Sequence, residues 1–152
     1  MNQKELLLMS YFRRNSRTPL TSISRKTRIP VSTIYDKLKE FEKKLIHKHT
    51  TLLDFKKLGY DVRVNMLIKT ADKEKMQNFL SNENRINNVF RLAGEYSFMI
   101  EGIFRDIQDL NDFSEKLETF QILERKEFFI LEDIKKEAFL TNSDLLPQQP
   151  MQ

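Results

Sequence analysis

Hydrophobic positions recur with two different periods along the chain, and the change falls near Gly59. Before it, apolar residues are spaced as on α-helices over residues 4–14, 19–27 and 31–44. After it, the stretch DVRVNMLIK (61–69) alternates strictly between apolar and polar positions, as a β-strand with one buried face does. The pattern therefore predicts a helical N-terminal part followed by a part that contains strands.

The N-terminal pattern predicts three short helices. Thr18-Pro19 is a favourable start for the second, because a hydroxyl suits the N-cap and proline suits the first helical position. Arg28-Ile29-Pro30 is predicted to be a turn, since a residue before proline avoids the α conformation. The third helix is expected to bury a stripe formed by Ile34, Leu38, Phe41 and Leu45. Three helices, the last two joined by a turn of about four residues, predict a helix-turn-helix.

The pattern after Gly59 predicts a second, mixed domain. Strands are expected over 61–69, 87–93, 97–104 and 122–131, and helices over 73–82 and 107–120. The second of these helices should bury Ile107, Leu110, Phe113 and Leu117. The order β-α-β-β-α-β is that of a ferredoxin-like fold, so the fold class is α+β.

One face of such a sheet is covered by its two helices and the other is left open. Depending on register, the open face would carry Met99, Ile103 or Phe104 and part of 128–131. An exposed apolar sheet face favours pairing with another subunit.

These patterns predict four segments. They are a helix-turn-helix (winged-helix-like) domain over 1–50, a strand and hinge over 51–60, a ferredoxin-like domain with an open sheet face for dimerisation over 61–140, and a flexible tail over 141–152. A further short helix is predicted over 133–140.

The charge distribution gives the two parts different tasks. Residues 1–60 contain 14 Lys and Arg against 5 Asp and Glu, a net charge of +9, whereas residues 61–152 contain 12 against 17, a net charge of −5. A basic module of this kind suits a polyanion such as double-stranded DNA. The 152 residues contain no cysteine and no apolar run long enough for a membrane span, so we expect a cytoplasmic, nucleoid-associated protein with no membrane partner.

The outward face of helix 31–44 carries short polar side chains first and cations further along, which is the arrangement that a recognition helix needs. Short polar side chains and a tyrosine suited to base edges occupy its N-terminal half: Ser32, Thr33, Tyr35 and Asp36. Cations suited to phosphates lie along it or just before it: Arg25, Lys26, Arg28, Lys39 and Lys43. Asp36 has two interpretations, as an acceptor for a cytosine amino group or as an ion-pair partner of Lys37 or Lys39. An ordinary charged surface helix is the alternative for the whole segment.

Other chemistry finds little support in the sequence. His47 and His49 share one face of an extended segment but have no evident third metal ligand, and no cofactor is expected. No catalytic triad, P-loop or dinucleotide fingerprint is present, so we do not expect an enzyme. An RNA-binding sheet would share the β-α-β-β-α-β order, but such a platform should be basic.

Residues 4–140 resemble the Lrp/AsnC (feast/famine) family of transcriptional regulators. The resemblance is carried by SISRKTRIPVSTIYDKLKEFEKKLI (22–46), LLDFKKLGY (52–60) and LAGEYSF (92–98). It implies a homodimer joined by its C-terminal sheets, assembling further into a tetramer or octamer, that binds semi-palindromic DNA. It also implies a small-molecule, amino-acid-like effector near Gly94, Glu95, Tyr96 and Ser97.

Two features depart from this family pattern. Members usually have a glycine in the turn before the recognition helix and a serine at its start, where this chain has Arg28 and Pro30. They often have an aspartate after the aromatic residue of the later turn, where this chain has Ser97. The predicted function is a sequence-specific transcriptional regulator. The alternative is an architectural protein of the same fold that binds DNA without sequence preference.

Overall fold

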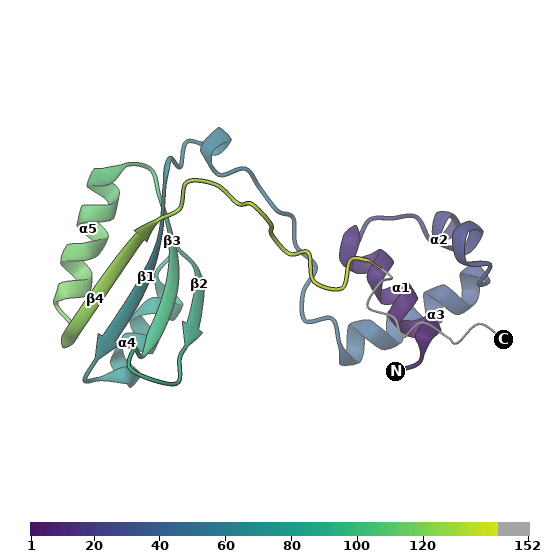
Figure 1. Ribbon diagram of the computed structural model, residues 1–152, viewed down its shortest axis with the longest axis horizontal. Coiled ribbons are helices and arrows are strands. Elements are labelled where there is room, and N and C mark those ends of the chain that lie inside the picture. Colours follow the sequence, from purple (N-terminus) through teal and green to yellow (C-terminus); the bar gives the residue numbers. More distant parts are fainter. Residues whose placement is uncertain (143–152) are drawn as a thin grey trace. The chain divides into compact units, whose positions relative to one another are not determined.

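The computed structural model describes residues 1–142, and these form two compact units (Figure 1). The first unit comprises residues 1–51 and the segment that begins at Lys135, and the second comprises residues 52–134. Residues 52–60 thus group with the sheet, and residues from Lys135 on group with the helices, which differs from the predicted domain limits. The end of the predicted tail, from residue 143 on, lies outside the described residues.

Three helices form the first unit: α1 (Gln3–Arg14), α2 (Leu20–Thr27) and α3 (Val31–Lys44). Helix α1 begins with a capping box, in which Asn2 and Glu5 each accept a hydrogen bond from the other's backbone N–H at 2.9 Å. Apolar side chains at helical spacing meet in one small core: Leu8, Phe12, Ile23, Ile34 and Phe41. The three predicted helices are confirmed, with the last two separated by a short turn.

The ends of these helices correct several local expectations. Thr18 is not the N-cap of α2; its hydroxyl donates to the Asn15 carbonyl at 2.9 Å, and Pro19 holds the cap position without a side-chain bond. Leu45 is 49% exposed because α3 ends at Lys44, and Ile46 packs against the core in its place. Residues 46–54 carry no regular secondary structure, so the predicted strand is absent from the described chain.

The second unit is a four-stranded antiparallel sheet with two helices. After a turn, η1 (Lys56–Leu58), ended by Gly59 at φ +86°, the elements are β1 (Val62–Thr70), α4 (Lys73–Asn82), β2 (Ile86–Arg91), β3 (Phe98–Phe104), α5 (Ile107–Glu118) and β4 (Ile122–Phe129). The strand order is β2-β3-β1-β4. This is the predicted ferredoxin-like arrangement, and the α+β fold class is confirmed.

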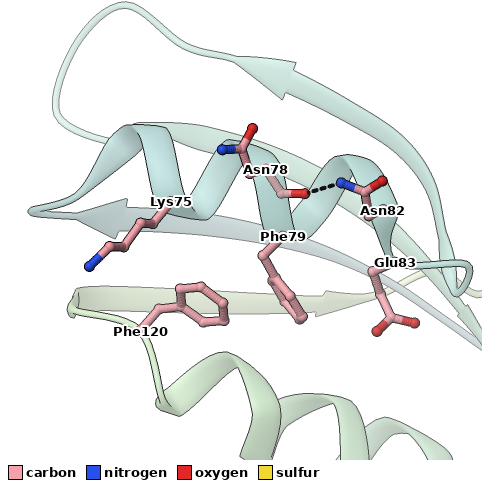
Figure 2. A pocket seen from close by; sticks show the side chains of 6 residues that line it. All are labelled: Lys75, Asn78, Phe79, Asn82, Glu83 and Phe120. Carbon is pink, nitrogen blue, oxygen red and sulfur yellow. Dashed lines mark hydrogen bonds between the residues drawn. The ribbon is translucent and has the colours of Figure 1, made fainter.

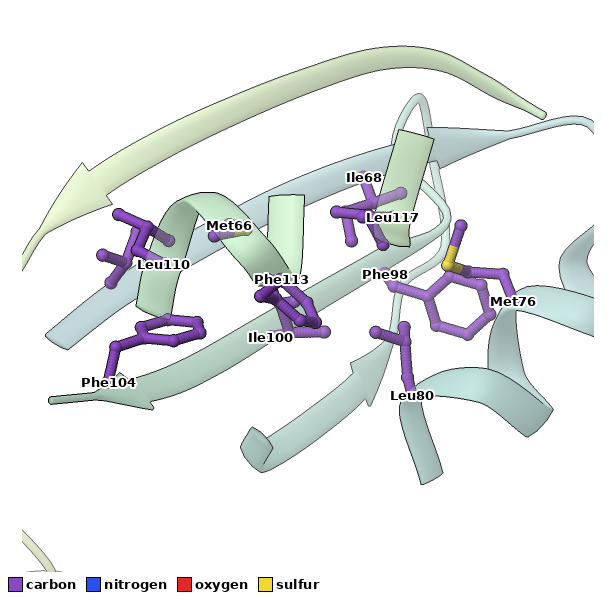
Figure 3. Packing of buried hydrophobic residues seen from close by; sticks show 11 residues of the cluster. Met66, Ile68, Met76, Leu80, Phe98, Ile100, Phe104, Leu110, Phe113 and Leu117 are labelled. Carbon is purple, nitrogen blue, oxygen red and sulfur yellow. The ribbon is translucent and has the colours of Figure 1, made fainter. Parts of the chain in front are cut away.

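One face of the sheet packs against α4 and α5 (Figure 3). Alternate residues of the two central strands, Val64, Met66 and Ile68 on β1 and Phe98, Ile100 and Phe104 on β3, are buried there with Met76, Leu80, Leu110, Phe113 and Leu117 from the helices. Ile107 was expected in this core but is 62% exposed. It is the first residue of α5, where the helix has not yet turned onto the sheet.

We call the opposite side of the sheet the open face. The strand register assigns to it Arg63, Asn65, Leu67, Lys69, Phe90, Met99, Glu101, Ile103, Glu124, Lys126 and Phe128. Of the predicted alternatives, Phe104 belongs to the core instead. Gly102 also lies on the core side, where an added Cβ would come within 2.5 Å of the Phe104 ring.

Residues from Lys135 to Asn142 form a C-terminal segment that contacts α1 (Figure 1). Arg13 bonds to the Glu137 carboxylate at 2.6 Å, and Arg14 donates to the Thr141 carbonyl at 2.7 and 3.0 Å. The segment has no helix, contrary to the prediction, and Glu137 and Leu140 adopt positive φ angles of 49° and 59°. Left-handed residues interrupt a helix, so this segment is irregular. Hydrogen bonds from the two α1 arginines hold it in place.

Arg85 connects the start of β2 to α5. Its guanidinium bonds to both carboxylate oxygens of Glu83 (2.8 and 3.0 Å) and to Asp109 (3.2 Å), and it lies 5.5 Å from the Phe113 ring centre. We expect Arg85→Ala to lower the free energy of unfolding by about 2 kcal/mol, because mostly buried carboxylates lose their partner. Chemical denaturation measures this, with exposed Lys73→Ala as the control; equal losses in both variants would contradict it.

The same group predicts a pH dependence. The hydrogen bonds from Arg85 hold the pKa of Glu83 below its ordinary value of 4.5, so the ionised form is favoured in the folded state. This stabilisation is fully present above the unfolded pKa and is lost as the pH falls through the lower folded pKa. The difference between the wild type and Arg85→Ala should therefore shrink below about pH 4.5.

Candidate nucleic-acid interface

Every predicted DNA-contacting residue is exposed on the first unit. On α3, Ile34 and Phe41 are buried, and this orientation turns Ser32, Tyr35 and Lys39 to the outside. Tyr35 is 51% exposed, and the Lys39 ammonium lies 5.6 Å from its ring centre. The outward face of α3 therefore combines small polar groups near its start with an aromatic ring and cations further along.

Pro30, not Ser32 or Thr33, occupies the N-cap of α3, and no side chain caps the helix. The hydroxyls of Ser32 and Thr33 make no hydrogen bond among residues 1–142. The first backbone N–H groups of a helix carry partial positive charge and attract phosphate. Because no side chain caps the start of α3, its first N–H groups and the hydroxyls of Ser32 and Thr33 are available to bind a ligand.

The turn before α3 depends on an unusual conformation of Arg28. This residue ends α2 in the left-handed region, at φ 58° and ψ 24°, and its N–H donates to the Ser24 carbonyl at 2.8 Å. Glycine adopts this conformation without strain, whereas a side chain pays a steric cost. The turn is thus formed without a glycine, and the Arg28 guanidinium lies close in sequence to the start of α3.

The cations around α3 fall into two groups. Lys37 and Lys39 are engaged within the unit: Lys37 bonds to Glu5 at 2.7 Å and to Glu40 at 3.0 Å, and Lys39 bonds to Glu42 at 2.9 Å. Four others form no ion pair within the described chain: Arg25, Lys26, Arg28 and Lys43. These four are the cations most available to phosphates.

The ion pairs also lower the pKa values of the carboxylates. Hydrogen bonds from Lys37 and then Lys44 lower the pKa of Glu40 to about 2. The hydrogen bond from Lys39 lowers the pKa of Glu42, which also lies 3.4 Å from His49 Nε2. Both carboxylates are therefore ionised at neutral pH and compete with phosphate for the lysines. Sequence reasoning missed Glu42, although its spacing of three residues from Lys39 on a helix was a usable signal.

Asp36 remains free of the ion pairs that the sequence allowed. Lys37 and Lys39, its two expected partners, bond to other carboxylates, and Asp36 has no partner among residues 1–142. Its exposed carboxylate is an acceptor that a cytosine amino group could use.

The predicted effector turn lies at one end of the open face. Gly94 has φ +126°, which a residue with a side chain rarely adopts, and Glu95 lies 3.8 Å from Lys69. The Tyr96 hydroxyl donates to Glu124 at 2.7 Å, and the Lys126 ammonium lies 5.3 Å from the Tyr96 ring centre. The Tyr96 side chain thus contacts one carboxylate and one cation.

Tyr96 and Ser97 differ in the polar groups that they expose at the surface. Although Lys126 lowers the pKa of Tyr96, the hydrogen bond to Glu124 and burial raise it overall. Ser97 is buried; its hydroxyl oxygen accepts from the Thr70 N–H at 3.3 Å and its own N–H donates to the Ile68 carbonyl. Ser97 therefore holds the turn against β1 and presents no polar group at the surface.

A groove on the other side of the sheet offers no reactive constellation (Figure 2). It has a volume of about 430 Å³ and is lined by Lys75, Asn78, Phe79, Asn82, Glu83 and Phe120. The rings of Phe79 and Phe120 lie 4.6 Å apart, and Glu83 is already bound by Arg85. Among residues 1–142, no three His, Asp or Glu side chains are grouped to hold a metal ion, and no described helix has the length and apolarity to cross a membrane.

Comparisons with known proteins agree with this architecture. The model of the Lrp/AsnC ligand-binding domain matches residues 62–139, just over half of the chain. The chain belongs to the Lrp/AsnC family. Its relatives are transcriptional regulators rather than enzymes, and this family member is likewise not an enzyme.

Individual members of the Lrp/AsnC family match over most of their length. The helix-turn-helix-type regulator PH1692 of Pyrococcus horikoshii is 26% identical over 83% of this chain and 87% of its own. The structure of Bacillus subtilis LrpC matches with a TM-score of 0.80 at 20% identity, covering 89% of this chain and 97% of LrpC. The regulator NMB0573 of Neisseria meningitidis, solved with L-Met, has a TM-score of 0.80 at 16% identity and covers 90% and 93%.

The left-handed turn gives a stability prediction. We expect Arg28→Gly to raise the free energy of unfolding by about 0.5 kcal/mol, because relief of the left-handed strain exceeds the entropy cost of glycine. Arg28→Ala keeps a Cβ and should give no such gain. Thermal denaturation of both variants measures the effect, and equal midpoints for Gly and Ala would show that the turn is unstrained.

Proposed function

We propose that this protein is a sequence-specific transcriptional regulator whose α3 enters the major groove of double-stranded DNA. The observation that carries the proposal is the outward face of α3. Its first half exposes Ser32, Thr33, Tyr35 and Asp36, with the Asp36 carboxylate unengaged within the described residues. Side chains of this size and polarity reach base edges, which carry the sequence information.

Phosphate binding is supported by the cations on either side of this face. Arg25, Lys26 and Arg28 precede α3 and Lys43 lies near its end, all four exposed. A cation without an ion-pair partner gives up only water and counterions when it binds a phosphate. Binding through them positions the helix without reading sequence. The site of action is accordingly the cytoplasm, on the chromosome.

Dimerisation through the open face is the second part of the proposal. Phe90 and Phe128 are 49% and 52% exposed there, on a sheet whose other face is fully packed. A twofold axis would place two recognition helices on half-sites about one helical turn apart, or a multiple of it. Assembly of dimers into tetramers or octamers would extend the contact to more turns of DNA.

An amino-acid-like effector is the third part. At the turn that contains Gly94, the Tyr96 side chain contacts the Glu124 carboxylate and the Lys126 ammonium, and Glu95 lies 3.8 Å from Lys69. A zwitterion needs one group of each sign, and the solved relative NMB0573 was obtained with L-Met. Gly94 shapes the turn and Ser97 anchors it, so contacts would come from Glu95 and Tyr96.

Selection of genome fragments by the purified protein at near-physiological salt tests the first part. Enrichment of a shared palindromic motif is expected. Broad retention without a motif would replace the proposal with the architectural alternative, and no retention with or without added amino acids would overturn DNA binding by α3.

Lys39 and Glu42 give a paired prediction on affinity. Lys39→Ala should weaken DNA binding about threefold to tenfold and reduce the salt slope by about one, since one phosphate contact is lost. Glu42→Gln should tighten binding about twofold to threefold, because Lys39 is released from its ion pair. Titrations at two salt concentrations measure both.

The control for Glu42→Gln is Glu115→Gln, which changes the net charge equally on α5. If both glutamine variants bind DNA alike, the gain is a general charge effect. If Lys39→Ala binds as the wild type does at both salt concentrations, α3 presents a different face.

Ser32 and Tyr35 should control base preference. We expect Ser32→Ala or Tyr35→Ala to lose about 1–3 kcal/mol of discrimination at one base pair of the selected motif, with little change on unrelated DNA. Competition binding against single-base variants measures this. Uniform loss on all sequences would assign both residues to backbone contact.

A further inference from the structure

The carboxylate of Glu42, near the end of α3, lies between two basic side chains. Its Oε2 atom accepts a hydrogen bond from the Lys39 ammonium at 2.9 Å, and its Oε1 atom lies 3.4 Å from Nε2 of His49. Each carboxylate oxygen therefore has its own basic neighbour. Lys39 belongs to the outward face of α3, whereas His49 belongs to the irregular segment that follows the helix.

The packing of Ile46 brings this segment back to the helix. The N–H groups of Leu45 and Ile46 both donate to the Phe41 carbonyl at 2.8 Å, and the Ile46 side chain then packs against the small core. Because the chain is anchored at Ile46, His49 reaches the Glu42 carboxylate on the preceding helix. The contact between His49 and Glu42 is therefore built on the core of the first unit.

Histidine adds a pH-dependent charge to this cluster. Imidazole is the side chain whose charge ordinarily changes between about pH 5 and 8. The hydrogen bond from Lys39 lowers the pKa of Glu42, and the same bond raises the pKa of Lys39, so both groups stay ionised over that range. His49 is thus the member of the three whose charge changes.

The other charged groups on the adjoining stretches of chain are basic or already paired. The Glu40 carboxylate is held by Lys37 and Lys44. The remaining charged or titratable groups at the end of α3 and on the segment itself are Lys43, His47 and Lys48. Among residues 1–142, Glu42 is the carboxylate within ion-pair distance of His49. A protonated His49 therefore has Glu42 as its partner.

We propose that His49 is a positioning residue for DNA binding: its protonated ring holds the Glu42 carboxylate and releases Lys39 to a backbone phosphate. The inference rests on the proposed role of α3 and adds control of its affinity by a proton. With a neutral ring, a phosphate must displace the carboxylate that Lys39 holds. With a charged ring, Glu42 keeps an ion-pair partner when Lys39 binds the DNA, so protonation and DNA binding favour each other.

The test follows the affinity for DNA against pH at constant ionic strength. A labelled duplex of mixed sequence is the probe, because phosphate contacts carry no sequence information. The wild type should bind about twofold to threefold more tightly at about pH 6 than at about pH 8, which is the size expected for one exposed ion pair.

A set of variants shows whether this rise passes through Glu42. His49→Gln, Glu42→Gln and Lys39→Ala should each lose the rise, because the imidazolium, the carboxylate or the released ammonium is missing. His47→Gln is the matched control. It removes the other histidine of the same exposed segment, and so an equal pH-dependent charge, and it should keep the rise.

The remaining outcomes separate this inference from the proposed function. If the rise persists in Glu42→Gln but disappears in His49→Gln, His49 contacts phosphate directly and its action through Glu42 is overturned. If the wild type shows no rise, or His47→Gln loses it, the role of His49 is overturned while DNA binding by α3 stands. If neither the wild type nor any variant binds the duplex at either pH, the proposed function fails and this inference fails with it.

Discussion

The alternation of side chains along β1 is the constraint on which the second unit depends. This strand pairs with β3 on one side and β4 on the other, so its side chains set both faces of the sheet. Val64, Met66 and Ile68 anchor the core under two helices, and the residues between them, Arg63 and Asn65 among them, are thereby forced onto the open face. A shift of one residue would exchange the two sets, and burial of three apolar side chains prevents it. The pairing of Arg63 with Glu101 and the turn at Gly94 both depend on this register.

The first unit combines a small core with many exposed cations. Five apolar side chains from three helices form that core, and the helix faces away from it are free for recognition. Some lysines are neutralised by carboxylates on the same helices, whereas the cations before α3 are not. The unit therefore holds its most available charge next to the short polar side chains of α3. Groups of the kinds that suit phosphates and base edges therefore share one surface.

Charged side chains are paired differently on the two units. Around α3, cations exceed their local partners, which favours a polyanion, whereas on the open face Arg63 and Glu101 satisfy each other. Charge that is paired within the chain can be covered by a similar surface, and charge that is unpaired attracts its complement. The positions of the carboxylates support the proposed division between DNA contact and subunit contact, and membership of the Lrp/AsnC family is consistent with it.

The sequence by itself determined the elements, because the two hydrophobic periods reflect local geometry that each segment carries alone. The strands, the two long helices of the second unit and the outward face of α3 were predictable for this reason, and the LAGEYSF turn carried the family resemblance. Only the tertiary structure decided where elements end and which side chains meet. Ile107 and Leu45 are exposed because helix ends turn away from the core, and Ser97 is buried because it both donates a hydrogen bond to β1 and accepts one from it. The pairing of Arg63 with Glu101, and of Arg13 with Glu137, joins residues 38 and 124 positions apart, and no local period encodes contacts at such separations.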